Sequence, residues 1–371
     1  MNIPLCKPSI GQEEIKKIEE VLKSGWLTHG PYNEEFEKNF ADYIGVKHAQ
    51  TINSCASALF IVLKALNIKG RVIVPSFTFV ATAHAVILAG ATPVFADIDL
   101  ETGNITAAAI EPLINEKTEA IIPVHFAGQS CQMDEIVELC QKHKLILIED
   151  SAEAIGAEYK NKKTGSFGIG CFSFFPTKNI TTGEGGMITT NDSDLAHKIK
   201  VMISHGIDKI SQTTFGWQRE AVMAGYNLRM SGILAGLGIE QLKKLETLND
   251  LRRQHADYLS KNLDKNLIAL PKESENCKHV YQMYTIRVDK KIRNQLVEEL
   301  KKAGIGASVH FSPAVHQQEY YNNFSRGDLK NTELLSDTII TLPMYPDLKK
   351  EELDYIIEKT NQITSDLTNN S

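Results

Sequence analysis

Short apolar runs alternate with helical segments through residues 71–150, and this alternation constrains the fold more than any other feature. The expected strands cover 71–75, 92–97, 120–125 and 145–150, and the expected helices cover 78–89, 106–115 and 132–143. Nearly continuous apolar strands are buried on both faces, so they predict an α/β fold with a mostly parallel sheet between helices. Right-handed crossovers then place Pro75, Asp97, His125 and Asp150 along one edge, where open α/β sheets bind ligands.

The alternation stops after about residue 190, which suggests a second domain. The elements expected beyond it are one or two long helices at 231–262, a strand at 281–288 and helices at 291–303 and 349–360. A chain of 371 residues also corresponds to roughly two domains at ~150 residues each. We expect a large domain over 1–250 and a smaller α+β domain over 251–371, with the N-terminal segment free to pack against the latter. A frayed tail is expected at 364–371.

Composition narrows the class of protein. The chain is 42% hydrophobic and 23% charged, and its net charge of -6 is spread along the sequence, which argues against nucleic acid or an anionic membrane surface as the main partner. No apolar run approaches the ~18 residues of a membrane span, and the N-terminus lacks the pattern of a signal peptide. The six cysteines form no CxxC pair. We expect a soluble cytoplasmic protein with reduced thiols and no metal site.

The strongest chemical signal is the segment GCFSFFPTKNITTGEGGM at 170–187. An apolar, aromatic strand ends at Pro176-Thr177, Lys178 follows at once, and a glycine-rich turn leads into the strand MITT. Burial between two apolar strands disfavours the ammonium form of a lysine and leaves an amine that can attack a carbonyl. The alternative is a lysine in an exposed turn, but the aromatic strand before it and the glycines after it favour the buried nucleophile.

Two further features place polar groups at the same edge. Asp150 ends the strand LILIED, although a lone aspartate in this position can equally cap a turn. The run Ser54-Cys55-Ala56-Ser57 opens the expected helix at 54–66, and a helix amino terminus with small side chains binds anions such as phosphate. Ser173, on the strand before Lys178, could add a hydroxyl, whereas serines at helix starts also serve as simple caps.

Several segments resemble the nucleotide-sugar aminotransferases of the DegT/DnrJ/StrS type. The matching segments are PSFTFVATAHAV (75–86), IEDSAEAIGA (148–157), FSFFPTKNITTGEGG (172–186) and GYNLRMS (225–231). The match keeps its order from GWLTHGPYNEEFE (25–37) to TLPMYP (341–346), nearly the whole chain. The resemblance implies a fold-type-I enzyme that depends on pyridoxal phosphate, with a mostly parallel seven-stranded sheet in its large domain and a smaller α+β C-terminal domain.

The resemblance also assigns roles to residues. It implies that Lys178 is the Schiff-base lysine and that Asp150 pairs with the pyridine nitrogen of the cofactor. Phosphate binding falls to Ser173 and to the group Ser54, Cys55, Ala56 and Ser57. Phe79 would stack on the pyridine ring, although core packing explains an aromatic residue there equally well. Asn227 would reach the phosphate of a neighbouring subunit, with Arg229 near the same interface, which implies a homodimer with shared sites.

Two positions depart from the pattern of the family. Glu153 stands where the family often has glutamine or histidine, and it could still bond the phenolic oxygen of the cofactor. The opening of the helix, commonly Ser-Gly-Thr, reads Ser54-Cys55-Ala56 and lacks the threonine hydroxyl. His310 and Thr28 match family positions near the substrate pocket. His310 and His316 show no carboxylate pattern that would indicate a metal site.

The sequence therefore predicts a transaminase that moves an amino group, by resemblance from L-glutamate, to a keto sugar. The expected acceptor is a nucleotide-linked 3- or 4-keto-deoxyhexose used for cell-surface polysaccharide, including lipopolysaccharide, or for natural products. The alternatives are an aminotransferase for a non-nucleotide keto sugar acid, a pyridoxal-phosphate sugar dehydratase, an enzyme directed at amino acids, and a non-catalytic regulator. Dehydratases of this family replace the lysine by histidine, so Lys178 argues against that alternative.

Overall fold

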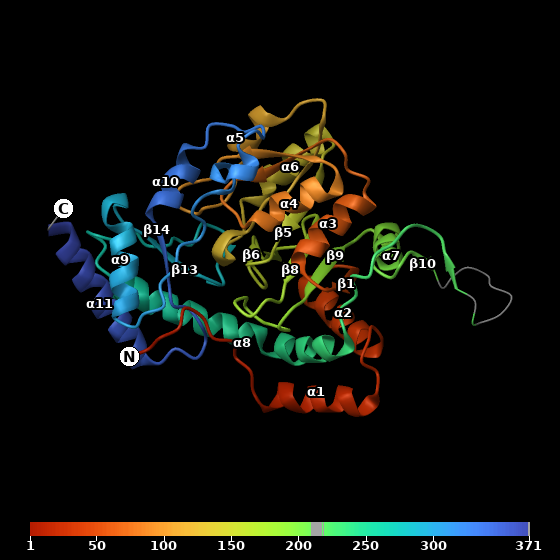
Figure 1. Cartoon of the computed structure of the whole chain (residues 1–371), viewed down its shortest axis with the longest axis horizontal. Coiled ribbons are helices and arrows are strands. Elements are labelled where there is room, and N and C mark those ends of the chain that lie inside the picture. The colour runs from red at the N-terminus through yellow and green to blue at the C-terminus, as the bar shows by residue number, and fades with distance from the viewer. Residues whose placement is uncertain (209–216, 218, 370–371) are drawn as a thin grey trace.

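The computed structural model describes residues 1–208, 217 and 219–369. A large domain is built around one sheet, and a smaller C-terminal domain lies beside it (Figure 1). The long helix α8 (Gly232–Asn262) runs beneath both of them as one unbroken helix. Residue 250, where the sequence predicts a domain boundary, lies inside α8. That boundary stays a prediction.

The sheet has seven strands in the order β1-β9-β8-β5-β4-β2-β3. The strands are β1 (His48–Ile52), β2 (Arg71–Pro75), β3 (Thr92–Ala96), β4 (Thr118–Ile121), β5 (Ile146–Asp150), β8 (Ile169–Ser173) and β9 (Gly186–Thr190). Only β9 runs antiparallel to its neighbours, so the carboxyl ends of the other six strands share one edge. The predicted mostly parallel sheet of seven strands is confirmed.

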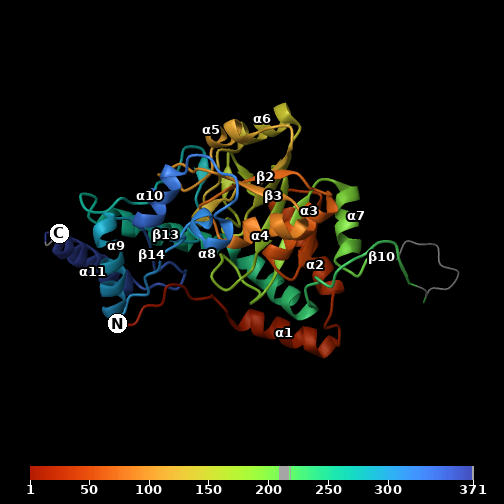
Figure 2. The same cartoon turned by 45° about the horizontal axis from the view of Figure 1, so that its top comes forward.

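Helices cover both faces because alternate side chains of each strand point to opposite sides. The helices of the large domain are α2 (Pro31–Ile44), α3 (Cys55–Ala65), α4 (Val80–Ala89), α5 (Ala107–Ile110), α6 (Met133–His143) and α7 (Ser193–Met202). Val72 and Val74 of β2 join α3, α4 and α7 in one core, whereas Ile73 joins α5 and α6 in another. Phe172 of β8 packs with α2 and α8. Figure 2 shows α3 and α4 in front of the sheet.

The smaller domain pairs two antiparallel strands, β13 (Tyr284–Arg287) and β14 (Ile339–Leu342). Its helices are α9 (Lys290–Lys302), α10 (Lys330–Thr338) and α11 (Lys350–Asn369). The N-terminal segment joins this domain: Ile3 is buried in its core and forms a bridge with Ile305. The segment then leads to α1 (Gln12–Ser24), which packs along α8 in both views.

Short elements complete the chain. They are β6 (Glu158–Tyr159), β7 (Lys162–Lys163), β10 (Ile207–Asp208), β11 (Glu220–Ala221), β12 (Cys277–Lys278), η1 (Glu111–Leu113), η2 (Phe126–Gly128), η3 (Val315–Gln317) and η4 (Glu319–Tyr321). None of the helices in the described part of the chain combines the length and the apolarity needed to span a bilayer.

Three expectations from the sequence need correction. The strand expected at 120–125 is β4, which ends at Ile121, and beyond it only an isolated bridge continues, in which Val124 pairs with Asp150. The helix expected at 106–115 is a short α-helix followed by the 3-10 turn η1, with Pro112 at its start. The tail is not frayed as far as it is described, since α11 continues to Asn369 with Thr364 buried against the smaller domain. Residues 370–371 of that tail lie outside the described residues.

Candidate active site

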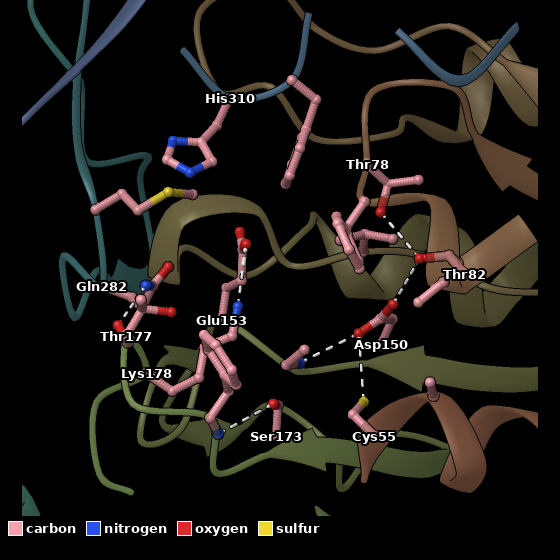
Figure 3. Close-up of a pocket in the computed structure, with 18 of the residues that line it drawn as sticks. Cys55, Thr78, Thr82, Asp150, Glu153, Ser173, Thr177, Lys178, Gln282 and His310 are labelled. Atoms are coloured by element: carbon pink, nitrogen blue, oxygen red, sulfur yellow. Dashed lines mark hydrogen bonds and ion pairs between the residues drawn. The ribbon is translucent and has the colours of Figure 1, made fainter. Parts of the chain in front are cut away.

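A cavity of about 400 Å³ lies at the carboxyl ends of β2, β5 and β8, where the smaller domain meets the sheet. The residues on its sheet side include Ser54, Cys55, Ala56, Thr78, Phe79, Thr82, Asp150, Glu153, Ser173, Phe175, Thr177 and Lys178. The residues facing them include Leu5, Cys6, Gln282, Met283, His310, Phe311, Thr341 and Met344. We call the first set the sheet wall and the second the outer wall; Figure 3 shows the polar members of both.

Asp150 is the last residue of β5, and its side chain is 5% exposed. Its Oδ2 accepts a hydrogen bond from Thr82 Oγ1 at 2.8 Å, and its Oδ1 accepts one from the Ala152 amide at 3.2 Å. The thiol of Cys55 lies 3.9 Å from Oδ1. Burial raises the pKa of the Asp150 carboxyl, and the bonds from Thr82 and Ala152 oppose this rise. A buried carboxylate held in this way is suited to a cationic ligand group.

Lys178 follows β8 through a tight turn, in which its amide donates to the Phe175 carbonyl at 2.9 Å. Its side chain is 16% exposed, and Nζ lies 3.3 Å from Glu153 Oε1. The other oxygen of Glu153 accepts from the Ala127 amide at 3.0 Å. Ala127 itself has a positive φ of 55°. The amine predicted from the sequence is therefore partly buried and faces a carboxylate, as Figure 3 shows.

The start of α3 provides a place for an anion. Ser54 caps this helix, its Oγ accepting from the Ser57 amide at 3.1 Å, and Cys55 and Ala56 line the cavity. The first amides of a helix have no partner within it, and they attract anions. Gly186 of β9 makes room for this approach, since a Cβ there would lie 2.7 Å from the Cys55 nitrogen. Small side chains and free amides fit a phosphate group.

The outer wall contributes fewer polar groups. His310 Nδ1 is hydrogen-bonded to Thr341 Oγ1 at 2.8 Å, and burial lowers the pKa of His310. Gln282 donates from Nε2 to the Thr177 carbonyl at 2.8 Å, which ties the outer wall to the residue before Lys178. On the opposite side, Phe79 of the sheet wall lines the cavity and is 61% exposed. Its ring centroid lies 6.4 Å from that of Phe311 in the outer wall.

Four predicted site residues lie away from the cavity within one chain. Ser57 is used in the cap of α3, and Thr28 is exposed before the start of α2. Asn227 is exposed and bridges Ser204, and Arg229 follows it on the same strand-like segment. The other predicted residues, namely Ser54, Cys55, Ala56, Phe79, Asp150, Glu153, Ser173, Lys178 and His310, come together in the cavity.

Sequence reasoning overlooked the contributions of Thr78, Thr82 and Gln282. A signal existed for the two threonines, because they follow β2 at the ligand edge and stand one helical turn apart. Gln282 comes from a distant segment and carried no local signal. His316, weighed as a metal ligand, instead contacts Ser76 Oγ at 2.7 Å and Glu333 at 3.2 Å. Among the described residues, no group of three or more His, Cys, Asp or Glu side chains could hold a metal ion.

Known proteins match this chain along most of its length. The model of the DegT/DnrJ/EryC1/StrS aminotransferase family matches residues 8–361. The spore coat polysaccharide biosynthesis protein SpsC of Bacillus subtilis is 39% identical over 377 residues, which cover 97% of each chain. Among solved structures, PseC of Helicobacter pylori, an aminotransferase involved in the biosynthesis of pseudoaminic acid, is 34% identical with a TM-score of 0.93, covering 99% of this chain and 100% of its own.

A further structure bears on the cofactor. The pyridoxal-phosphate form of Spr1654 of Streptococcus pneumoniae is 29% identical with a TM-score of 0.93, and the alignment covers 99% of this chain and 100% of that chain. The sheet wall of the present chain fits that cofactor, because it offers an amine, a buried carboxylate and an anion site in one cavity. The chain therefore belongs to the DegT/DnrJ/EryC1/StrS aminotransferase family, whose members are pyridoxal-phosphate-dependent sugar aminotransferases.

Proposed function

We propose that this enzyme transfers the amino group of L-glutamate to a nucleotide-linked 3- or 4-keto-deoxyhexose in the cytoplasm. The observation that carries the proposal is the placement of Lys178 and Asp150 in one cavity at the edge of the sheet, with the helix start at Ser54 beside them. An amine, an acid and an anion site in this arrangement fit transamination better than binding alone.

Each residue of the sheet wall has a distinct task in this proposal. Bound pyridoxal phosphate supplies an aldehyde carbon that carries the amino group and a ring that withdraws electrons. Asp150 would hold a proton on the ring nitrogen, and Lys178 Nζ would take and return the proton that moves during transfer. Glu153 would contact the phenolic oxygen, and Phe79 would cover one face of the ring. The phosphate would be held by Ser173 and by the helix start at Ser54, Cys55 and Ala56, where the amide of Ser57 is used in the cap.

The acceptor is inferred from the relatives. SpsC is named for spore coat polysaccharide biosynthesis, and PseC for the biosynthesis of pseudoaminic acid. The name of SpsC supports a product destined for a surface polysaccharide, and that of PseC supports an aminotransferase in the biosynthesis of a sugar. The cavity has a volume of about 400 Å³, which lies within the usual range for small-molecule sites, ~300–1,000 Å³. His310, in the outer wall, is the residue we expect to contact the sugar.

We also propose a homodimer with shared sites. Asn227 and Arg229 lie outside the cavity of their own chain, and Asn227 is exposed. In a dimer, Asn227 of one copy would bond the phosphate held by the other, and Arg229 and Thr28 would lie near the acceptor. A cross-complementation experiment tests this: a mixture of Lys178→Ala and Asn227→Ala chains should regain about a quarter of wild-type activity by random pairing. No recovery would contradict shared sites.

The reaction itself is tested with the pyridoxamine form of the enzyme. This form is incubated with nucleotide-linked 3- and 4-keto sugars, free keto sugar acids and 2-oxo acids, and the return of visible absorbance is followed. We expect a nucleotide-linked keto sugar and 2-oxoglutarate to restore it, since these are the acceptor and the donor product. If only a free keto sugar acid restores the absorbance, the acceptor is that acid and not a nucleotide-linked sugar. If only 2-oxo acids restore it, the enzyme is not a sugar aminotransferase.

A further inference from the structure

Two threonines link the start of α4 to the carboxylate of Asp150. Thr82 Oγ1 donates to Asp150 Oδ2 at 2.8 Å, and Thr78 Oγ1 lies 2.9 Å from Thr82 Oγ1. Thr78 and Thr82 are 2% and 1% exposed, so water does not compete for these bonds. Figure 3 shows the chain of contacts running from Thr78 through Thr82 to Asp150.

The direction of these bonds follows from counting protons. An ionised carboxylate only accepts hydrogen bonds, so Thr82 must give its single hydroxyl proton to Asp150. Thr82 can then only accept from Thr78, and both hydroxyls are oriented towards the carboxylate. If Asp150 took up a proton on Oδ2, it would itself become a donor to Thr82, and the orientation of the pair would have to reverse. A hydroxyl that donates to a carboxylate stabilises the charged form more than the neutral form, so the bond from Thr82 favours the ionised form of Asp150.

The other groups around Asp150 act in both directions. Burial and the nearby carboxylate of Glu153 disfavour its negative charge, whereas Lys178 and the Ala152 amide favour it. The thiols of Cys55 and Cys171 are buried and have pKa values raised well above the ordinary range, so they stay protonated and add no charge. Thr82 lies in the first turn of α4, whose positive end also favours an anion. Among these groups, the hydroxyl of Thr82 makes the shortest hydrogen bond to Asp150.

We propose that Thr78 and Thr82 form a positioning pair that keeps Asp150 ionised and fixes the direction of its carboxylate towards the cofactor. The inference rests on the proposed role of Asp150. Only an ionised aspartate can hold a proton on a ring nitrogen, because a protonated one would offer a proton itself. Thr82 bonds to the aspartate directly and Thr78 acts through Thr82, so neither threonine needs to touch the cofactor or the substrate.

The test measures the dissociation constant of pyridoxal phosphate from the apoprotein as a function of pH. In Thr82→Val, which preserves the volume of the side chain, we expect affinity at neutral pH to fall about tenfold, the usual effect of one hydrogen bond to a charged group. The acid limb of the binding curve should move up by about one pH unit, because Asp150 is then protonated more easily. Thr82→Ser keeps the hydroxyl and should restore both values.

A second variant protects the test against a folding defect. Thr78→Val leaves the bond from Thr82 to Asp150 in place and removes only its support, so we expect a smaller shift of the acid limb in the same direction. A purely structural role would weaken binding equally at every pH in both valine variants. An unmoved acid limb in either folded valine variant would overturn the proposal.

Asp150→Asn separates this inference from the proposed function. If the asparagine variant loses affinity while Thr82→Val binds as the wild type does at every pH, the positioning pair is wrong and the role of Asp150 stands. If Asp150→Asn itself binds pyridoxal phosphate with wild-type affinity over the whole range, the role of Asp150 falls, and the inference falls with it.

Discussion

The two walls of the cavity are built in different ways. The sheet wall takes its polar groups from the ends of adjacent strands and from the first turns of α3 and α4, and those groups bond to one another. The outer wall is assembled from the N-terminal segment and from short pieces near residues 282, 310 and 341. Its polar groups are few, and most of its surface is apolar. The polar sheet wall is suited to binding the cofactor, whereas the outer wall is suited to selecting the substrate.

From this difference we infer that the two walls have different functions. A rigid scaffold that positions polar groups on strand ends suits a cofactor, whereas residues on loops vary more easily with the substrate. The comparison predicts that changes in the sheet wall affect turnover and cofactor binding, and that changes in the outer wall affect the acceptor. The experiments below test this separation, from the largest expected effect to the smallest.

Lys178→Ala should produce the largest loss. We expect turnover to fall by at least ~100-fold, because the variant lacks the amine that moves protons. Binding of pyridoxamine phosphate should persist, since the carboxylate of Asp150 and the helix start at Ser54 remain. Steady-state rates and a binding titration measure the two effects. Lys142→Ala, on the exposed surface of α6, is the control and should keep wild-type rates. Retention of more than about a hundredth of the activity by Lys178→Ala would contradict the assignment.

The segment just before Gln282 of the outer wall should limit stability in acid. His279 stacks on Tyr281 with ring centroids 3.9 Å apart, and its Nδ1 accepts from the Tyr281 amide at 2.9 Å. Burial lowers the pKa of His279 to about 3, against about 6.5 in the unfolded chain. The folded state resists protonation, so its stability is full above about pH 6.5 and is lost as the pH falls towards 3.

His279→Gln removes this titration and should flatten the fall of the unfolding free energy between pH 7 and pH 4, by on the order of a few kcal/mol. Denaturant unfolding of the apoprotein at several pH values gives the slope. His143→Gln changes an exposed histidine on α6 and should leave the slope as in the wild type. Equal slopes in His279→Gln and the wild type would show that another group controls acid stability.

His310→Gln tests the separation of the walls directly. We expect the KM of the sugar acceptor to rise about tenfold, the usual effect of losing one polar contact to a ligand, with little change in the affinity for pyridoxal phosphate. Kinetics with varied acceptor and a cofactor titration measure both. Thr341→Val keeps the ring but removes its hydroxyl partner, and it should give a smaller rise. An equal loss of cofactor affinity would mean that His310 belongs functionally to the sheet wall.

The smallest effect expected among these variants is the loss of stability caused by Ser54→Ala. The loss of the cap of α3 destabilises the apoprotein by about 1 kcal/mol. The affinity for pyridoxal phosphate should fall as well, because Ser54 lies at the phosphate site. Thr106→Ala removes the cap of α5, where Thr106 accepts from the Ala109 amide at 3.2 Å, and it should lower stability without affecting the cofactor. Equal cofactor binding in the two variants would place the phosphate elsewhere.

Local patterns predicted most of the large domain. The strands at 71–75 and 145–150 and the helices at 54–66 and 132–143 were found within two residues of their bounds, because each is a strongly apolar or periodic run. Helix α2 was overlooked, since its apolar positions are separated by charged residues. The end of β4 was placed too late because an apolar run does not show where the regular strand gives way to an isolated bridge, here between Val124 and Asp150.

The residues of the site also fall into those that the sequence identified and those that only the structure revealed. The sequence by itself determined Lys178, Asp150 and the helix start at Ser54, because each stands at the end of a recognisable strand or at the start of a helix. The resemblance had already placed His310 near the substrate pocket, but only the tertiary structure decided that Thr82 bonds to Asp150 and that Gln282 reaches Thr177. The physical reason is that strand order and domain packing bring these side chains together from distant positions, and no local pattern in the chain encodes such contacts.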